Sequence, residues 1–173
     1  DKKQALKTWS FSVGEPTIQP YFGQLHSHTG EYSDGAGFLS DALDYVAAIP
    51  EADNVQFVAF TDHSNYFDNA EAYNPAAALG DASQMTAESK KTWDAYRKAM
   101  TTFNNKDNGR LAIAGFEMTW SGGPGHMNTF NSDGLVSRNN PDLNSKANKT
   151  KDEGMQLYYA ELSKPENAQT VSQ

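Results

Sequence analysis

The stretch Val55–Asp62, with the sequence VQFVAFTD, is the strongest indication of fold in this chain of 173 residues. Apart from Gln56, its side chains are apolar on both faces of an extended strand. A strand that is buried on both faces is typical of a parallel sheet covered by helices. The run continues directly into Thr61-Asp62-His63, which places polar groups at its carboxyl end. We therefore predict an α/β fold with a ligand site at the ends of its strands.

Helical periodicity lies on both sides of this strand. Upstream, apolar residues recur at spacings of four, three and three before Pro50, which predicts a helix over residues 39–49. Downstream, Met85–Asn104 is predicted to be helical. Its apolar stripe is interpreted as core and consists of Trp93, Tyr96, Met100 and Phe103.

Two further strands are predicted after the second helix. Leu111–Phe116 is interpreted as a third strand that ends in Glu117, and His126–Phe130 as a fourth. The glycine-rich run 121–125 between them lacks the spacing of a phosphate-binding loop, so it is interpreted as a tight connection. The alternation of strands and helices predicts a parallel sheet.

The remaining segments are assigned more simply. Residues 1–20 are a polar lead-in that could form a short edge strand or a flap. Residues 65–83 are predicted to be a loop with at most one short helix, and residues 133–149 a polar loop. Thr150–Leu162 is predicted to be a helix, and Gln169–Gln173 the approach to a strand that is not completed.

Upstream of all these elements lies the stretch Tyr21–Asp34, YFGQLHSHTGEYSD. If it begins as a strand, His26 and His28 project from one face, because side chains alternate along a strand. Two neutral imidazoles that converge on one point can bind a borderline metal ion. Asp34 follows in a Ser-Asp-Gly turn, from which its carboxylate could bend back over the strand end. The alternative is a pair of ordinary surface or core histidines.

Composition restricts the chemistry of such a site. The chain has no cysteine, so any metal ion must be held by His, Asp and Glu. The net charge of -8 argues against a nonspecific nucleic-acid surface, which needs a basic stripe. No apolar stretch approaches the roughly 18 residues of a membrane-spanning helix. A small anionic substrate would need metal ions that locally reverse the negative field.

The polar candidates fall at the ends of predicted strands, including all 4 histidines of the chain. Because the carboxyl ends of parallel strands meet at one edge of a sheet, we predict that these side chains share a metal site. The alternative for His63 and His126 is a structural role with hydrogen-bonded rings. The predicted group consists of His26, His28, Asp62, His63, Glu117 and His126.

Five motifs in this order carry a resemblance to a known family: His26-Ser-His28-Thr29, Asp34-Gly35, Thr61-Asp62-His63, Glu117 and Gly125-His126. The stretch from about Tyr21 to His126 resembles the PHP family of metal-dependent phosphoesterases, named for polymerase and histidinol phosphatase. The resemblance implies a distorted, TIM-like barrel of seven β/α units with two or three divalent metal ions at its strand ends. This chain would supply about the first four strands and their helices.

The resemblance also implies a role for each matching residue. The two histidines of the His-x-His motif resemble ligands of the first metal ion, and Glu117 resembles the carboxylate that bridges the first and second. His126 resembles a ligand of the second ion, and Asp34 with His63 resembles a pair on the third. Imidazole with carboxylate suits Mn, Zn and Fe alike.

Asp62 has no ligand role in the family pattern. We predict that it orients a metal-bound histidine, as carboxylates beside metal-binding imidazoles usually do. Together with Glu117 it is counted among the predicted catalytic residues.

The family pattern continues with another strand-end histidine, often in an Asn-His-Pro context, and a late Asp-x-His. This chain has no fifth histidine and stops at Gln173, so each metal ion would lack one protein ligand. We therefore expect residues 21–173 to be the N-terminal portion of a longer domain, completed by its missing C-terminal part or by a second chain. The start at Asp1 indicates either a processed chain or an excised fragment, and the Asn/Ser/Thr-rich, lysine-poor composition favours a secreted or extracellular bacterial protein over a cytoplasmic one.

The resulting hypothesis is hydrolysis of a small phosphorylated substrate by a metal-activated hydroxide. Arg138 is a candidate phosphate-binding side chain, with a solvated surface arginine as the alternative. Trp120 could line the pocket beside Glu117 or could be a packed loop aromatic. Two other classes stay open: a secreted metal-binding module without turnover, and a nuclease-like activity of the PHP kind.

Overall fold

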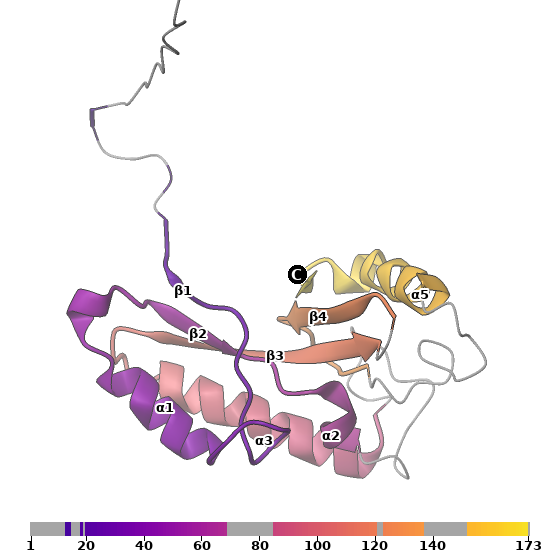
Figure 1. The fold of residues 1–173 in the computed structure, drawn as a ribbon, viewed down its shortest axis with the longest axis horizontal. Coiled ribbons are helices and arrows are strands. Elements are labelled where there is room, and N and C mark those ends of the chain that lie inside the picture. Colours follow the sequence, from indigo (N-terminus) through magenta and orange to yellow (C-terminus); the bar gives the residue numbers. More distant parts are fainter. Residues whose placement is uncertain are drawn as a thin grey trace, which may run out of the picture.

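The structure is a computed structural model of the chain, and it describes residues 20–68, 85–120, 123–136 and 152–172, with residues 13, 14 and 18. Within these residues the fold is mixed α/β, with one sheet of five strands in the order β1-β2-β3-β4-β5 (Figure 1). Most of the predicted lead-in 1–20 and most of the two predicted loops lie outside the described residues.

The sheet is parallel in its first half and antiparallel in its second. Parallel pairing joins β1 (Gly23–Gln24), β2 (Phe57–Phe60) and β3 (Leu111–Trp120). Antiparallel pairing joins β3 to β4 (Gly125–Phe130) and β4 to β5 (Val171–Ser172). The prediction of an entirely parallel sheet is therefore wrong, because the connection from β3 to β4 is far too short for a parallel crossover.

Two strand predictions also need correction. The third strand was predicted to end at Phe116, but β3 continues to Trp120 because its second half pairs with β4. The segment Gln169–Gln173 was predicted to approach a strand that is not completed, whereas the short strand β5 forms there and pairs with the end of β4 at Thr129 and Phe130.

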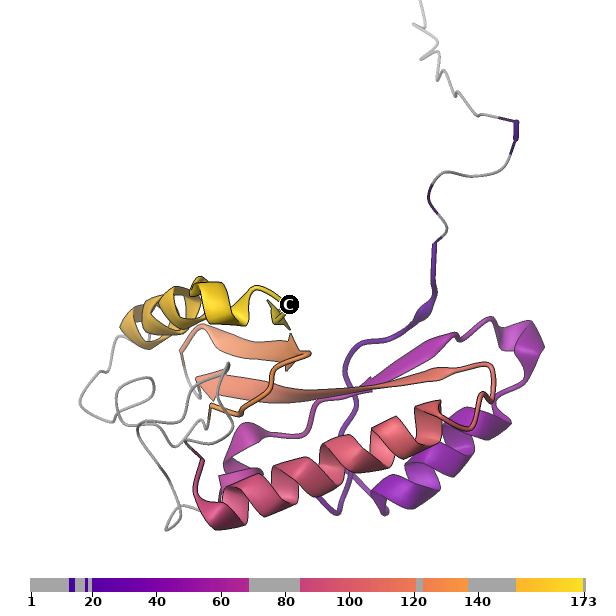
Figure 2. The ribbon, with the colours of Figure 1, turned by 180° about the vertical axis from the view of Figure 1, so that it is seen from behind.

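The helices on either side of β2 confirm their predictions to within two residues. They are α1 (Leu39–Ala48) and α3 (Ala87–Asn104), and they lie side by side over one face of the sheet (Figure 2). Thr86 caps α3 by accepting a hydrogen bond from the Ser89 N–H at 3.3 Å. The first turn of α1 has no such cap, and Glu31 accepts from the Leu39 N–H at 3.0 Å instead. The loop after β1 is thereby tied to α1.

The other described helices are η1 (Glu51–Asp53), α2 (Ser64–Asp68), α5 (Asp152–Leu162) and η3 (Pro165–Asn167). Of these, α5 confirms the helix predicted over Thr150–Leu162 to within two residues. The helix α2 follows β2 directly, where a loop with at most one short helix was predicted. None of the described helices is both long enough and apolar enough to cross a membrane.

The hydrophobic core lies between the helices and one face of the sheet, here called the outer face. Phe116 contributes to it from β3 and meets Trp93 of α3 edge-on. Trp120 points the same way as Phe116 and meets Tyr158 of α5. Glu117 lies on the opposite, inner face, where it pairs with Asn128 of β4.

The sheet is curled around this inner face. The Asn128 amide of β4 donates to the Leu25 carbonyl just after β1, at 3.5 Å, although two strands separate them in the sheet. The curl is what allows side chains from the ends of β1 and β2 to meet those of β3 and β4. That the curled sheet is part of a TIM-like barrel stays a prediction.

Candidate metal centre

His26 and His28 lie in the extended segment that follows β1. The Thr61 N–H donates a hydrogen bond to the carbonyl of Ser27 at 2.8 Å, which fixes this segment beside the end of β2. Ser27 is the residue between the two histidines in the sequence. The two Nε2 atoms come within 2.9 Å of each other. The predicted convergence of the two imidazoles is therefore present, although β1 itself ends at Gln24.

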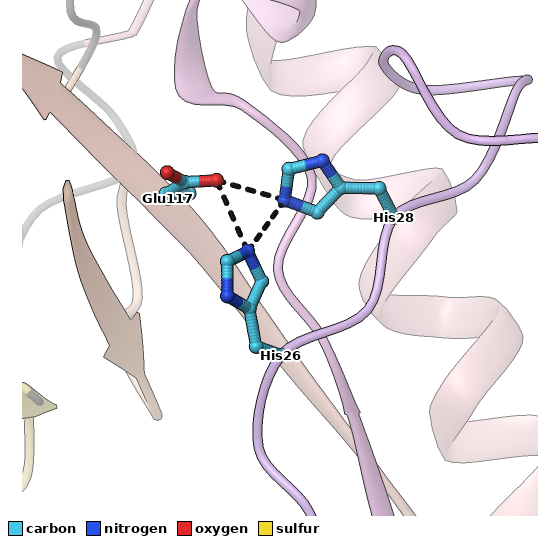
Figure 3. A group of neighbouring side chains, drawn as sticks. All are labelled: His26, His28 and Glu117. Atoms are coloured by element: carbon cyan, nitrogen blue, oxygen red, sulfur yellow. Dashed lines mark hydrogen bonds and ion pairs between the residues drawn. The ribbon is translucent and has the colours of Figure 1, made fainter.

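Glu117 is the common partner of this pair. Its Oε2 atom lies 3.2 Å from Nε2 of His26 and 2.8 Å from Nε2 of His28 (Figure 3). The residue is only 1% exposed, because it stands in the middle of β3 and faces the inside of the curled sheet. A buried carboxylate needs charged or hydrogen-bonding partners to offset its lost hydration. Histidines provide these partners here.

The dimensions of this triangle fit a bound cation. Ligand atoms about 2.1 Å from one ion lie about 3.0 Å apart in octahedral and about 3.4 Å apart in tetrahedral geometry. The three edges of the triangle, 2.9, 3.2 and 2.8 Å, lie close to the octahedral value and are shorter than the tetrahedral one. The donor set of two imidazoles and one carboxylate is also one that divalent metal ions accept.

Asp34 and His63 form a second group with His28. The Nδ1 of His28 lies 2.7 Å from Oδ1 of Asp34, and the Nε2 of His63 lies 3.2 Å from its Oδ2. His63 follows β2 and forms an isolated parallel bridge with Glu117, so it extends the pairing of β2 with β3. The group His28, Asp34 and His63 could hold a metal ion.

The loop that carries Asp34 folds back closely on the His-x-His segment. A Cβ atom on Gly35 would lie 2.3 Å from the carbonyl oxygen of His28 and 2.8 Å from the N–H nitrogen of Thr29. Only a glycine leaves room for backbone at this distance. The Asp-Gly sequence therefore serves the site by allowing Asp34 to reach His28.

His126 completes a third group on the antiparallel half of the sheet. It pairs with Thr119 across β3 and β4, and its Nδ1 contacts Oε1 of Glu117. His63 approaches the same carboxylate, with Nδ1 at 3.4 Å from Oε2. The group His63, Glu117 and His126 could therefore also hold a metal ion, and Glu117 belongs to two of the three groups.

In the metal-free protein, the histidines and the carboxylates of the cluster shift each other's pKa towards the charged form. The hydrogen bond to Glu117, with a further one to Asp34, raises the pKa of His28 to about 9. Burial alone would raise the pKa of Glu117, but the hydrogen bond from His28 and the nearby His63 and His126 lower it to about 2. A cation that binds here would take the place of the proton on the imidazolium.

Asp62 does not orient a histidine as predicted. Its Oδ1 accepts hydrogen bonds from the Thr29 N–H at 2.7 Å, the Thr29 hydroxyl at 3.1 Å and the Ser33 hydroxyl at 2.7 Å. Its Oδ2 accepts from the Tyr96 hydroxyl of α3 at 3.0 Å. The carboxylate is fully buried and joins the loop after β1 to α3, and its hydrogen bonds go to none of the four histidines.

The two predicted substrate residues have different outcomes. Trp120 is 1% exposed and lies on the outer face, three residues from Glu117 and therefore on the opposite side of β3. It meets Tyr158 edge-on at 5.6 Å, which agrees with the packed aromatic that was the alternative. Arg138 lies outside the described residues.

One residue of the site was missed in the sequence. Thr119 is 2% exposed and lies on the same face of β3 as Glu117, two residues further on. Its hydroxyl contacts both His63 and His126. The spacing of two residues from Glu117 is visible in the sequence. It could not place Thr119 on the same strand face, however, while the strand was predicted to stop at Phe116.

No family model matches the chain, and no curated protein matches its sequence. The evidence for the candidate site is therefore its geometry.

Proposed function

We propose that this chain carries the metal centre of a phosphoesterase, which hydrolyses a small phosphate ester with the help of two or three divalent cations. The observation that carries the proposal is the meeting of three overlapping ligand groups on the inner face of the sheet. Their ligands are His26, His28, Asp34, His63, Glu117 and His126, from segments far apart in the chain.

Divalent cations bound at these groups would lower the pKa of a coordinated water and offset the charge of phosphoryl oxygens. The chain's own residues would hold the cations close together through Glu117, whose two oxygens face different histidines. Two or three divalent cations would outweigh the charges of the carboxylates Asp34 and Glu117, and neutral imidazoles add none, so a loaded site would be positive, as an anionic substrate requires. Mn, Zn and Fe all suit this donor set.

The accessibility of the ligands favours catalysis over a purely structural site. About half of the His26 side chain, 55% of Asp34 and 58% of His126 are exposed, while Glu117 behind them is buried. Structural metal sites are closed by protein ligands, whereas catalytic sites keep an open position for water or substrate. Membership of the PHP family remains part of the proposal, and the order of the five motifs in the sequence supports it.

The test is turnover of a chromogenic phosphate ester by the chain after metal removal and reloading with Mn, Zn or Fe. We expect metal-dependent hydrolysis that Glu117→Gln abolishes, because the amide cannot serve as a charged shared ligand. Glu88→Gln, on the exposed first turn of α3, is the matched control and should retain full activity.

The outcomes separate the competing functions. Tight metal binding without any hydrolysis would support a metal-binding module in place of an enzyme. Hydrolysis that is indifferent to metal removal, or a chain that takes up no metal ion, would overturn the proposal. A nuclease-like activity is opposed by the net charge of -8 and would show as salt-dependent binding of DNA.

A further inference from the structure

An exposed aromatic side chain lies beside the group of His28, Asp34 and His63. Tyr66 belongs to α2, follows His63 by three residues and is 54% exposed. Its ring is stacked beside the His63 ring, with 6.3 Å between the centroids and 25° between the planes. Asp34 is also open to solvent, and its Oδ2 lies 3.2 Å from Nε2 of His63. A ligand that reaches Asp34 and His63 from solvent would therefore arrive close to the Tyr66 ring.

The short helix α2 holds this ring in place. Phe67, the next residue, is 2% exposed and packs edge-on against Trp93 and Tyr96 of α3, with centroids 5.3 and 5.0 Å away. The Tyr66 N–H donates a hydrogen bond to the His63 carbonyl at 3.1 Å. One aromatic residue of α2 thus anchors the helix in the core while its neighbour faces solvent. A ring on an anchored backbone loses little freedom when a ligand stacks on it.

Exposure alone would not distinguish this tyrosine, because single apolar residues are common on protein surfaces. Tyr45 of α1, for example, is 73% exposed. Tyr66 differs because its ring lies against a histidine of the candidate metal centre. It therefore adds a flat apolar surface to the edge of a polar, charged group. Binding sites for small molecules typically combine aromatic side chains with a few polar groups in this way.

We propose that Tyr66 is a specificity-determining residue, which stacks on a planar, aromatic leaving group of the phosphate ester. This inference rests on the proposed function and names the class of its substrate. In an aryl ester a single oxygen atom separates the ring from the phosphorus. A phosphoryl group held at Asp34 and His63 would therefore bring that ring close to Tyr66. An aliphatic ester of the same size would gain less, because it has no flat π-face to stack.

The test compares the hydrolysis of phenyl phosphate and cyclohexyl phosphate, two esters of similar size of which only the first has a flat ring. We expect Tyr66→Ala to raise the KM for phenyl phosphate roughly 3- to 10-fold, and that for cyclohexyl phosphate less than about twofold. Tyr66→Phe keeps the ring and should retain both values. Tyr45→Ala is the matched control for an exposed tyrosine lost elsewhere, and it should also leave both values unchanged.

A second readout does not depend on turnover. Benzylphosphonate and cyclohexylmethylphosphonate have a methylene group in place of the ester oxygen, so a phosphoesterase does not cleave them. In the metal-loaded wild type, bound benzylphosphonate should shift the NMR signals of the Tyr66 ring through its ring current, whereas cyclohexylmethylphosphonate should not. Titration calorimetry should show that Tyr66→Ala binds benzylphosphonate roughly 3- to 10-fold more weakly. Equal affinity in the wild type and a folded Tyr66→Ala variant, or a wild type that binds neither phosphonate, would overturn the inference.

The two readouts distinguish this inference from the proposed function. If the wild type prefers benzylphosphonate through Tyr66 but hydrolyses no ester, the phosphoesterase proposal fails while the aromatic binding site is supported. If the protein hydrolyses both esters and Tyr66→Ala changes neither KM nor the affinity for benzylphosphonate, only the role of Tyr66 fails.

Discussion

Asp62 serves the candidate metal centre without touching it. Its carboxylate accepts hydrogen bonds from the backbone N–H and hydroxyl of Thr29, the hydroxyl of Ser33 and the hydroxyl of Tyr96. The loop that is fixed in this way begins directly after His28 and leads to Asp34. Asp62 therefore fixes the loop between His28 and Asp34 without contacting either of their side chains, and its burial follows from having a donor for each oxygen.

This role gives two different outcomes for two substitutions. Asp62→Ala leaves several buried donors without a partner and should lower the free energy of unfolding by about 3 kcal/mol. Asp62→Asn should cost only about 1 kcal/mol, because its oxygen can keep the three donors at Oδ1 while the Tyr96 hydroxyl turns to accept from the amide.

Denaturant unfolding of the metal-free protein measures both values. Metal binding should persist in Asp62→Asn, since no ligand is changed. A variant that unfolds normally and binds metal, yet loses all hydrolysis, would restore the catalytic role that we predicted for Asp62 from the sequence.

At the scale of single residues, the sequence identified all six residues of the groups that could hold a metal ion, but not their supporting contacts. His26, His28 and His63 follow the ends of short extended or apolar runs, and the hydrophobic pattern of the sequence is enough to predict this position. The hydrogen bond between Asp62 and Tyr96 could not be predicted, because Tyr96 lies 34 residues away on a helix whose apolar stripe predicts core packing. Hydrogen bonds between distant elements depend on the folded geometry.

The strands and helices differ in how well their limits could be predicted. The long helices have strong periodicity, and Thr86 and Pro50 mark their ends. The strand β3 was cut short at Phe116 because Glu117 interrupts an apolar run and buried carboxylates are rare. Its true length follows from the hairpin with β4, which shields Glu117 and supplies His126.

Asn104 tests whether the scaffold and the site are separable at this scale. Its amide donates to the Ala112 carbonyl at 2.9 Å, and its oxygen accepts from the Ala112 N–H at 2.8 Å. It thus joins the end of α3 to the beginning of β3, where β4 does not pair. We expect Asn104→Ala to lower the free energy of unfolding by about 1–2 kcal/mol without changing metal affinity.

The neighbouring exposed residue offers a matched control. Asn105→Ala should change the stability by less than about 0.5 kcal/mol. Thermal or denaturant unfolding with metal titration of the same samples measures both effects. A large loss of metal affinity in a folded Asn104→Ala variant would show that the two ends of β3 are coupled, contrary to this account.

For the whole molecule, the curl of the sheet is the property that creates the site. His26 and Glu117 are 91 residues apart in the chain, and His126 comes from the antiparallel half of the sheet. The sequence predicted the mixed use of strands and helices and the gathering of histidines at strand ends. It did not predict the change from parallel to antiparallel pairing, which depends on how the short connection after Trp120 turns the chain.

The most direct test is anomalous X-ray diffraction from crystals of the chain grown with Mn or Zn. This account predicts an anomalous peak about 2.0–2.2 Å from Nε2 of His26, Nε2 of His28 and a Glu117 oxygen, with further peaks near Asp34 or His126 as occupancy increases. Peaks confined to other parts of the molecule, or none at saturating metal, would contradict it.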